Sequence, residues 1–127
     1  MELKSSGKIQ EFETGSIRDN SSDKPRMELL PWDLMPRLAR LYALGAKEYG
    51  DNNWRLGQPN SKVYGSIIRH LIKWILRRKD EDHLAAAIWN IFTIMHNETH
   101  YKDNPYICDM GTYSNLDNNI RDNEDLK

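Results

Sequence analysis

Hydrophobic side chains recur at helical spacing in three stretches of this chain, which are separated by prolines, glycines and polar clusters. The spacing predicts helices over about residues 32–49, 62–78 and 82–100. The connection between the second and third helices is short, so these two helices should lie antiparallel. The pattern therefore predicts an all-α fold, a compact bundle of three main helices.

Two of these helices are apolar around much of their circumference. Hydrophobic residues cover more than half of the second helix, and the third carries large apolar residues on nearly every side from Leu84 to Met95. Helices of this kind pack against more than one neighbour. A chain of 127 residues forms one domain whose core a partner chain would enlarge, so we expect a homo-oligomer.

Hydrophobic residues show no regular spacing at either end of the chain. Residues 1–24 are polar and predict a flexible arm, residues 25–104 hold the helical domain, and residues 105–127 form a polar tail. The tail could dock on the bundle through its scattered apolar residues, which are Tyr106, Ile107, Met110, Tyr113 and Leu116. The last ten residues of the tail predict disorder.

The composition argues against several classes of protein. The formal net charge is −1, whereas binders of nucleic acid or membrane surfaces carry a basic excess. One cysteine, Cys108, excludes an intramolecular disulfide and suits a reducing compartment. The longest uncharged run is too short to span a bilayer, and no signal pattern opens the chain. We expect a cytoplasmic protein without a membrane partner.

One narrow polar stripe interrupts the third helix. His83, Asn90, Thr93 and Asn97 follow one another at spacings of seven, three and four, which places them on one helical face. Buried polar groups need partners. The stripe therefore allows two interpretations, hydrogen bonds to neighbouring helices or the floor of a ligand pocket.

The second helix carries a stripe of positive charge. Six basic residues and no acidic residue lie between Lys62 and Lys79. Arg69 and Lys73 share one face near the middle of this helix, with His70 beside them. A charged stripe is usually a solvated face, but a stripe of one sign also suits an anionic ligand, and Arg69 and Lys73 are the phosphate candidates.

Two further places allow a structural and a functional interpretation. Lys24 and Arg26 flank a proline ahead of the first helix, as a rigid lead-in or as phosphate contacts. Trp54 stands next to Arg55 in the polar loop 50–60. This tryptophan either fills a gap in the core or offers a flat face to a nucleobase.

Three segments together resemble a known family. They are Lys24-Pro25-Arg26 with Leu30-Pro31, then Gly45-Ala46-Lys47-Glu48-Tyr49-Gly50-Asp51-Asn52-Asn53-Trp54, and then Arg69-His70-Leu71 with Trp74, Asp82-His83-Leu84-Ala85-Ala86 and Trp89-Asn90. In this order they resemble the phage-encoded dATP/dGTP diphosphohydrolase N-terminal domain, which is similar to the all-α MazG-like nucleotide pyrophosphohydrolases. The resemblance implies an oligomeric, MazG-like nucleotide-binding domain over residues 25–104 and a phage or prophage origin.

The carboxylates of this chain depart from the MazG-like pattern. Those enzymes hold magnesium with carboxylates one helical turn apart on two helices, and hard divalent cations need that density of oxygen ligands. This chain offers Glu48 alone in the first helix and Asp51 in the loop after it. The third helix offers carboxylates at its very start and near its end, namely Asp80, Glu81, Asp82 and Glu98. Glu48 and Asp82 are therefore the expected magnesium ligands, and Glu48, Asp82 and His83 are the expected catalytic residues.

Three hypotheses for function follow. The first is a magnesium-dependent enzyme that hydrolyses a purine (deoxy)nucleoside triphosphate to the monophosphate and pyrophosphate. The second is a non-catalytic protein that sequesters a nucleotide and so counters host antiviral defence that signals through nucleotides. The third is a DNA- or protein-binding helical module, against which the near-neutral charge counts. The first two share the expected ligand-binding residues Lys24, Arg26, Lys47, Tyr49, Asn53, Trp54, Arg69, His70, Lys73 and Asn90.

Overall fold

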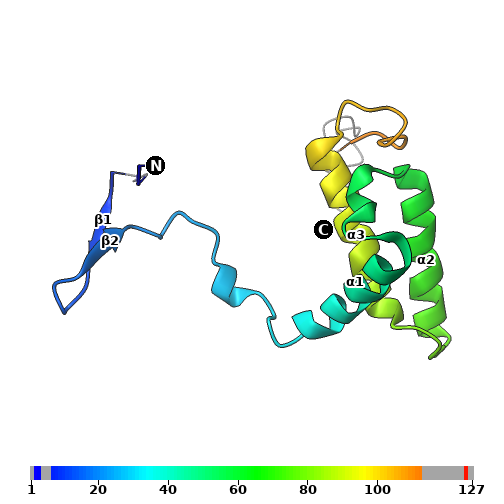
Figure 1. Ribbon diagram of the computed structural model, residues 1–127, viewed down its shortest axis with the longest axis horizontal. Coiled ribbons are helices and arrows are strands. Elements are labelled where there is room, and N and C mark those ends of the chain that lie inside the picture. Colours follow the sequence, from blue (N-terminus) through cyan, green and yellow to red (C-terminus); the bar gives the residue numbers. More distant parts are fainter. Residues whose placement is uncertain (1, 4–6, 113–124, 126–127) are drawn as a thin grey trace. The chain divides into compact units, whose positions relative to one another are not determined.

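The computed structural model describes residues 2–3, 7–112 and 125 (Figure 1). The chain divides into two units, residues 1–32 and residues 33–127. The boundary lies directly before the first long helix. The expected disorder of the last ten residues concerns a part of the chain that, apart from Asp125, lies outside the described residues.

The first unit contains a small antiparallel sheet. Strand β1 (Ile9–Glu11) pairs with β2 (Ile17–Asp19), with Gln10 opposite Arg18. Gly15 takes a positive φ of 86° in the turn, where its amide donates to Phe12 O. The all-α prediction therefore needs amendment for this unit, and the flexibility expected of residues 1–24 stays a prediction. A short 3-10 helix, η1 (Met27–Leu29), follows.

The second unit is helical, as predicted. Its described part contains α1 (Met35–Tyr49), the 3-10 helix η2 (Asn53–Leu56), α2 (Asn60–Ile75) and α3 (His83–His100). Helices α2 and α3 lie side by side and run in opposite directions (Figure 1), which confirms the expected antiparallel pair. Helix α1 and η2 both contact α3, so α3 is the element on which the others assemble.

The helix boundaries have local causes. Helix α1 begins three residues later than predicted, at Met35, with Pro36 in its first turn, where a missing N–H costs nothing. Gly50 ends it with a φ of 92°. Helix α2 stops at Ile75, before Arg77 takes a left-handed φ of 61°. Asp82 caps α3, because its carboxylate accepts a hydrogen bond from Ala85 N at 3.2 Å.

The segment after α3 folds back on the start of α2. Ile107 is buried, and its carbonyl accepts a hydrogen bond from Asn60 N at 2.8 Å. The carboxylate of Asp109 accepts hydrogen bonds from the amide and the hydroxyl of Ser61, and these bonds lower the pKa of Asp109. Asp109 thus accepts hydrogen bonds at the N-terminal end of α2 from a distant part of the sequence. The predicted domain limit at residue 104 stays a prediction.

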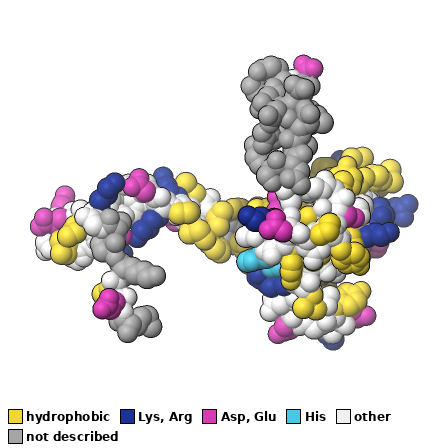
Figure 2. Space-filling view, turned by 90° about the horizontal axis from the view of Figure 1, so that it is seen from above, with side chains coloured by type: hydrophobic (Ala, Val, Ile, Leu, Met, Phe, Trp, Pro, Cys, Tyr) yellow, Lys and Arg dark blue, Asp and Glu magenta, His cyan; other side chains and the backbone are white. Residues whose placement is uncertain are grey.

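The buried hydrophobic core among the described residues is small. It contains Leu38, Val63, Ile67, Ala85, Ala86, Ala87, Ile107 and Cys108. Larger apolar side chains of α2 and α3 are exposed instead, among them Ile72, Ile91 and Met95. Figure 2 shows hydrophobic side chains at the surface of the helical unit. No helix in the described part of the chain is long and apolar enough to cross a membrane.

Candidate functional site

A pocket of about 670 Å³ lies within the helical unit. Its walls come from the C-terminal half of α1, the loop that carries η2, the middle of α2, and α3. The volume falls within the range of sites for small ligands. The lining includes Tyr49, Asn53, Trp54, His70 and Asn90, so five of the expected ligand-binding residues lie around one cavity.

Aromatic rings form one part of the pocket lining. Trp89 packs on Tyr42 with ring centroids 5.2 Å apart, and Trp54 meets Tyr42 edge to face at 5.9 Å. Burial raises the pKa of Tyr42 to about 12, so its phenol keeps the proton at neutral pH. Trp54 is half-buried and lines the pocket while it also touches the ring of His96. The core and ligand interpretations of Trp54 are therefore compatible.

A glycine allows these rings to lie so close to α1. An ideal Cβ built on Gly45 would lie 2.3 Å from one atom of the Trp89 indole and 3.0 Å from the next. Such an approach is too short for any side chain at position 45. The indole of Trp89 therefore rests directly on the backbone of α1, which explains the glycine in the middle of an otherwise regular helix.

The polar stripe of α3 divides into structural and pocket residues. Asn97 is fully buried outside the pocket lining, where its amide donates to Gln58 O at 3.0 Å and to Asn60 Oδ1 at 2.8 Å. Asn90 and Thr93 line the pocket and donate to carbonyls one turn earlier in α3. Asn90 uses one of its two Nδ2 hydrogens in this way, so the other hydrogen and the side-chain oxygen are left for a ligand.

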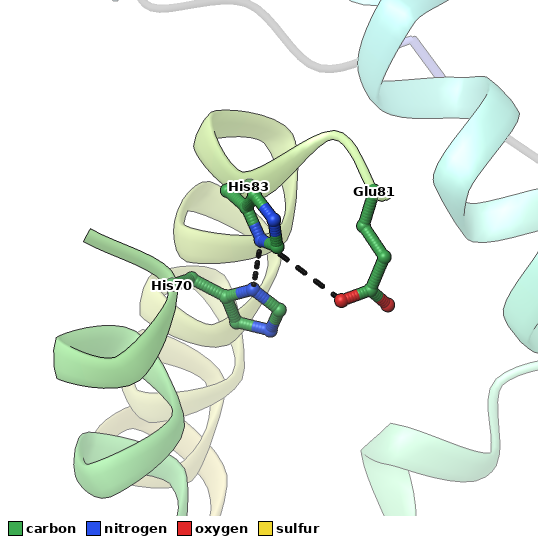
Figure 3. A group of neighbouring side chains, drawn as sticks. All are labelled: His70, Glu81 and His83. Carbon is green, nitrogen blue, oxygen red and sulfur yellow. Dashed lines mark hydrogen bonds and ion pairs between the residues drawn. The ribbon is translucent and has the colours of Figure 1, made fainter. Parts of the chain in front are cut away.

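Two histidines and a glutamate come together beside the pocket (Figure 3). His70 projects from α2, His83 from the first turn of α3, and Glu81 from the connection before it. One ligand atom from each residue can be chosen so that all three lie within 4.8 Å of one another. The two Nδ1 atoms are 3.0 Å apart, and Glu81 Oε2 is 3.9 Å from His83 Nδ1. His70 and Glu81 also line the pocket.

Hydrogen bonds determine which nitrogen of His83 is available. His83 is only 3% exposed, and its Nε2 lies 2.9 Å from Asp80 Oδ1. The bond to His83 lowers the pKa of Asp80, so this carboxylate is ionised and can only accept. His83 therefore donates through Nε2–H, and in this tautomer Nδ1 carries a lone pair. Burial also lowers the pKa of His70, which favours its neutral form.

The expected magnesium ligands are not part of this cluster. Asp82 binds the guanidinium of Arg37 through both oxygens, at 2.6 and 2.7 Å, and the Arg37 hydrogen bond lowers the pKa of Asp82. Glu48 is exposed and, like Asp82, lies outside the pocket lining. The cluster itself does not fit magnesium, which prefers oxygen ligands in octahedral geometry. Catalytic and metal roles for Glu48 and Asp82 stay predictions.

The expected phosphate-binding cations lie outside the pocket lining. Arg69 donates from Nη2 to the pocket-lining Ser66 at 3.0 Å, so it stands at the edge of the cavity. The positive charges of Lys73 and Arg69 contribute to the lowered pKa of His70, which places both near the cluster. Lys47 is exposed on α1. Roles for all of these side chains in ligand binding stay predictions.

Two more cations belong to the other unit. Lys24 pairs with Asp19 at 3.2 Å, and Arg26 pairs with Glu28 at 2.8 Å. Both ion pairs lie within residues 1–32. Contact of Lys24 or Arg26 with a phosphate therefore stays a prediction.

Sequence reasoning missed three residues of the site. Tyr42 and Trp89 make the aromatic lining, and Glu81 completes the histidine cluster. A signal for Glu81 exists in the sequence, since His70 and His83 flank a short turn between antiparallel helices and Glu81 lies in that turn.

Comparisons with known proteins give one positive finding. No curated protein and no solved structure matches the chain. Residues 14–105 match the model of the family described as dATP/dGTP diphosphohydrolase, N-terminal. The match covers most of the chain, including α1, η2, α2, α3 and the complete pocket lining. The chain therefore belongs to the dATP/dGTP diphosphohydrolase N-terminal family.

Proposed function

We propose that the pocket binds a purine (deoxy)nucleotide. The observation that carries the proposal is the joint lining of aromatic rings and side-chain amides in a chain of the dATP/dGTP diphosphohydrolase family. Trp54 and Tyr42 offer surfaces on which a base can stack, and Asn53 and Asn90 offer amide groups that can read its edge. The cavity volume suits one nucleotide.

An unused hydrogen-bond donor in the lining supports the proposal. The Nε1–H of Trp89 is buried and has no hydrogen-bond partner among the described residues. Buried donors are nearly always paired in folded proteins. Trp89 lines the pocket, so a ligand there can supply the missing acceptor.

Substitution of Trp54 tests the ligand class. We expect dATP and dGTP to raise the thermal midpoint of the wild-type chain, and Trp54→Ala to weaken their binding by about 5- to 150-fold, because a stacked base contributes roughly 1–3 kcal/mol. Trp54→Phe keeps a ring and should restore part of the affinity. The matched control is Trp74→Ala, which removes a tryptophan of α2 outside the pocket. No stabilisation by either nucleotide, or equal loss in both alanine variants, would refute the proposal.

The fate of the nucleotide separates two candidate activities. Hydrolysis of the triphosphate to monophosphate and pyrophosphate agrees with the family description. The scarcity of carboxylates favours sequestration without hydrolysis, because magnesium needs several oxygen ligands. Asp51 and Glu81 are the acidic residues among the described lining, and Asp82 is bound to Arg37. A chain of phage origin could use sequestration against host nucleotide signalling. Chromatography of the nucleotide after incubation with magnesium distinguishes monophosphate and pyrophosphate from intact ligand.

We also assign the exposed apolar faces of α2 and α3 to contact with a second copy of the chain. The core of one chain contains few large side chains, whereas Ile68, Ile72, Ile88 and Phe92 are exposed. Apolar patches rarely stay uncovered in stable proteins. Light scattering should give a mass above that of one chain, and Ile72→Glu should reduce it. Leu44→Glu, at an exposed position of α1, is the control and should leave the mass unchanged. A monomeric wild-type chain would contradict the assignment.

A further inference from the structure

We propose that His70, His83 and Glu81 form a binding site for a divalent transition metal ion of the zinc class, open toward the pocket. Two imidazole nitrogens and one carboxylate are a ligand set that such ions accept in proteins, and a site with three protein ligands keeps a position for an external ligand. The site uses residues of α2, of α3 and of the turn between them. It differs from a magnesium site built of carboxylates.

The distances suit an ion of this size. Two nitrogens that each lie about 2.0–2.1 Å from a tetrahedral ion are roughly 3.3 Å apart. The Nδ1 atoms of His70 and His83 are 3.0 Å apart, so a small rotation of either ring opens the required space. Glu81 Oε2 lies 3.9 Å from His83 Nδ1 on an exposed side chain that can move closer.

The surroundings of His83 prepare it as a ligand. Asp80 binds the Nε2–H of this ring at 2.9 Å and leaves the Nδ1 lone pair directed toward His70. A carboxylate behind a metal-bound histidine is the usual partner that fixes the ring and its tautomer. When no metal is bound, the Nδ1–H of His70 donates a hydrogen bond to Nδ1 of His83. On metal binding, His70 releases this proton to solvent and takes up one at Nε2, so that it changes tautomer and stays neutral. The ligand atoms are then both unprotonated, as metal binding requires.

The charge of the pocket gives the ion a role. No lysine or arginine is among the described residues that line the cavity, although Asp51 and Glu81 are. An anionic ligand would meet negative charge there. A divalent ion held by His70 and Glu81 would make the charge on this side of the pocket positive, close to Arg69 and Lys73. Phosphate binding at this ion rests on the proposed function, whereas the metal site does not.

Metal titration of the full-length chain tests the site without any nucleotide. After removal of metals with a chelator, we expect one Zn²⁺ per chain by calorimetry, and visible Co²⁺ absorption of a site with nitrogen and oxygen ligands. Mg²⁺ should not displace either ion. His70→Gln and Glu81→Gln should each weaken binding by more than about tenfold, and Asp80→Asn should weaken it roughly 10–100-fold. The first two side chains are half-buried or exposed, so their variants should fold.

Matched variants elsewhere on α3 separate this site from unspecific binding. His100→Gln and Glu98→Gln remove an exposed histidine and an exposed glutamate outside the cluster, and both should bind Zn²⁺ as the wild-type chain does. Absence of Zn²⁺ binding, equal binding in all variants, or loss in His100→Gln would overturn the proposal. A chain that binds Zn²⁺ but no nucleotide would retain the metal site and refute only the proposed function.

Discussion

Asn97→Ala is expected to destabilise the helical unit by about 3 kcal/mol. The side chain of Asn97 is 0% exposed and makes two hydrogen bonds, one to Gln58 in the loop between η2 and α2 and one to Asn60, the first residue of α2. Alanine leaves the carbonyl of Gln58 and the side-chain oxygen of Asn60 without this donor and leaves a void. Urea denaturation followed by circular dichroism measures the loss.

The control for this prediction lies on the same helix. Thr99 is exposed, and its hydroxyl bonds only to Met95 O of α3 itself. Thr99→Ala should therefore change the free energy of unfolding by about 0.5 kcal/mol or less. A loss below about 1 kcal/mol in Asn97→Ala would show that the buried amide does not hold the loop in place.

Gly45→Ala is expected to cost about 2 kcal/mol, although alanine favours a helix over glycine by about 1 kcal/mol. The new methyl group would lie within 2.3 Å of the Trp89 indole. Overpacking of this kind costs about 1–3 kcal/mol, and here the ring is confined by Tyr42 as well. Because Trp89 lines the pocket, the same variant should weaken nucleotide binding.

Gly65 provides a matched control of opposite sign. It lies in the interior of α2, and the atom nearest to its ideal Cβ is Nη1 of Arg69 at 3.2 Å, the end of a flexible side chain. Gly65→Ala should therefore stabilise the chain by up to about 1 kcal/mol. If Gly45→Ala also stabilised the chain, the close packing of Trp89 on α1 would be wrong.

The helices could be predicted because their signals are local. Apolar periodicity, Gly50 and Asp82 mark α1 and α3 without any tertiary information. The paired strands of the first unit could not, since each has three residues and no alternation that requires a buried face. The contact of Asp109 with Ser61 spans 48 residues and has no signature in either segment.

The site was only partly predictable for the same reason. Spacing placed Asn90 and Asn97 on one face of α3, but it did not reveal that residues 58–60 cover Asn97 while the pocket reaches Asn90. His70 was expected to bind ligand and His83 to act in catalysis. Their direct contact depends on the register between α2 and α3, which spacing within one helix does not contain.

Nucleotide binding in the pocket can be tested most directly with the four tryptophans of the chain. Trp54 and Trp89 line the pocket, whereas Trp74 and Trp32 do not. Each contributes one indole N–H signal to a proton–nitrogen correlation spectrum, and single substitutions assign the signals. On titration with dGTP, we expect the Trp54 and Trp89 signals to shift, that of Trp89 most strongly because its N–H gains an acceptor. The Trp74 and Trp32 signals should stay in place. Saturating dGTP that leaves the Trp54 and Trp89 signals unchanged would contradict nucleotide binding in this pocket.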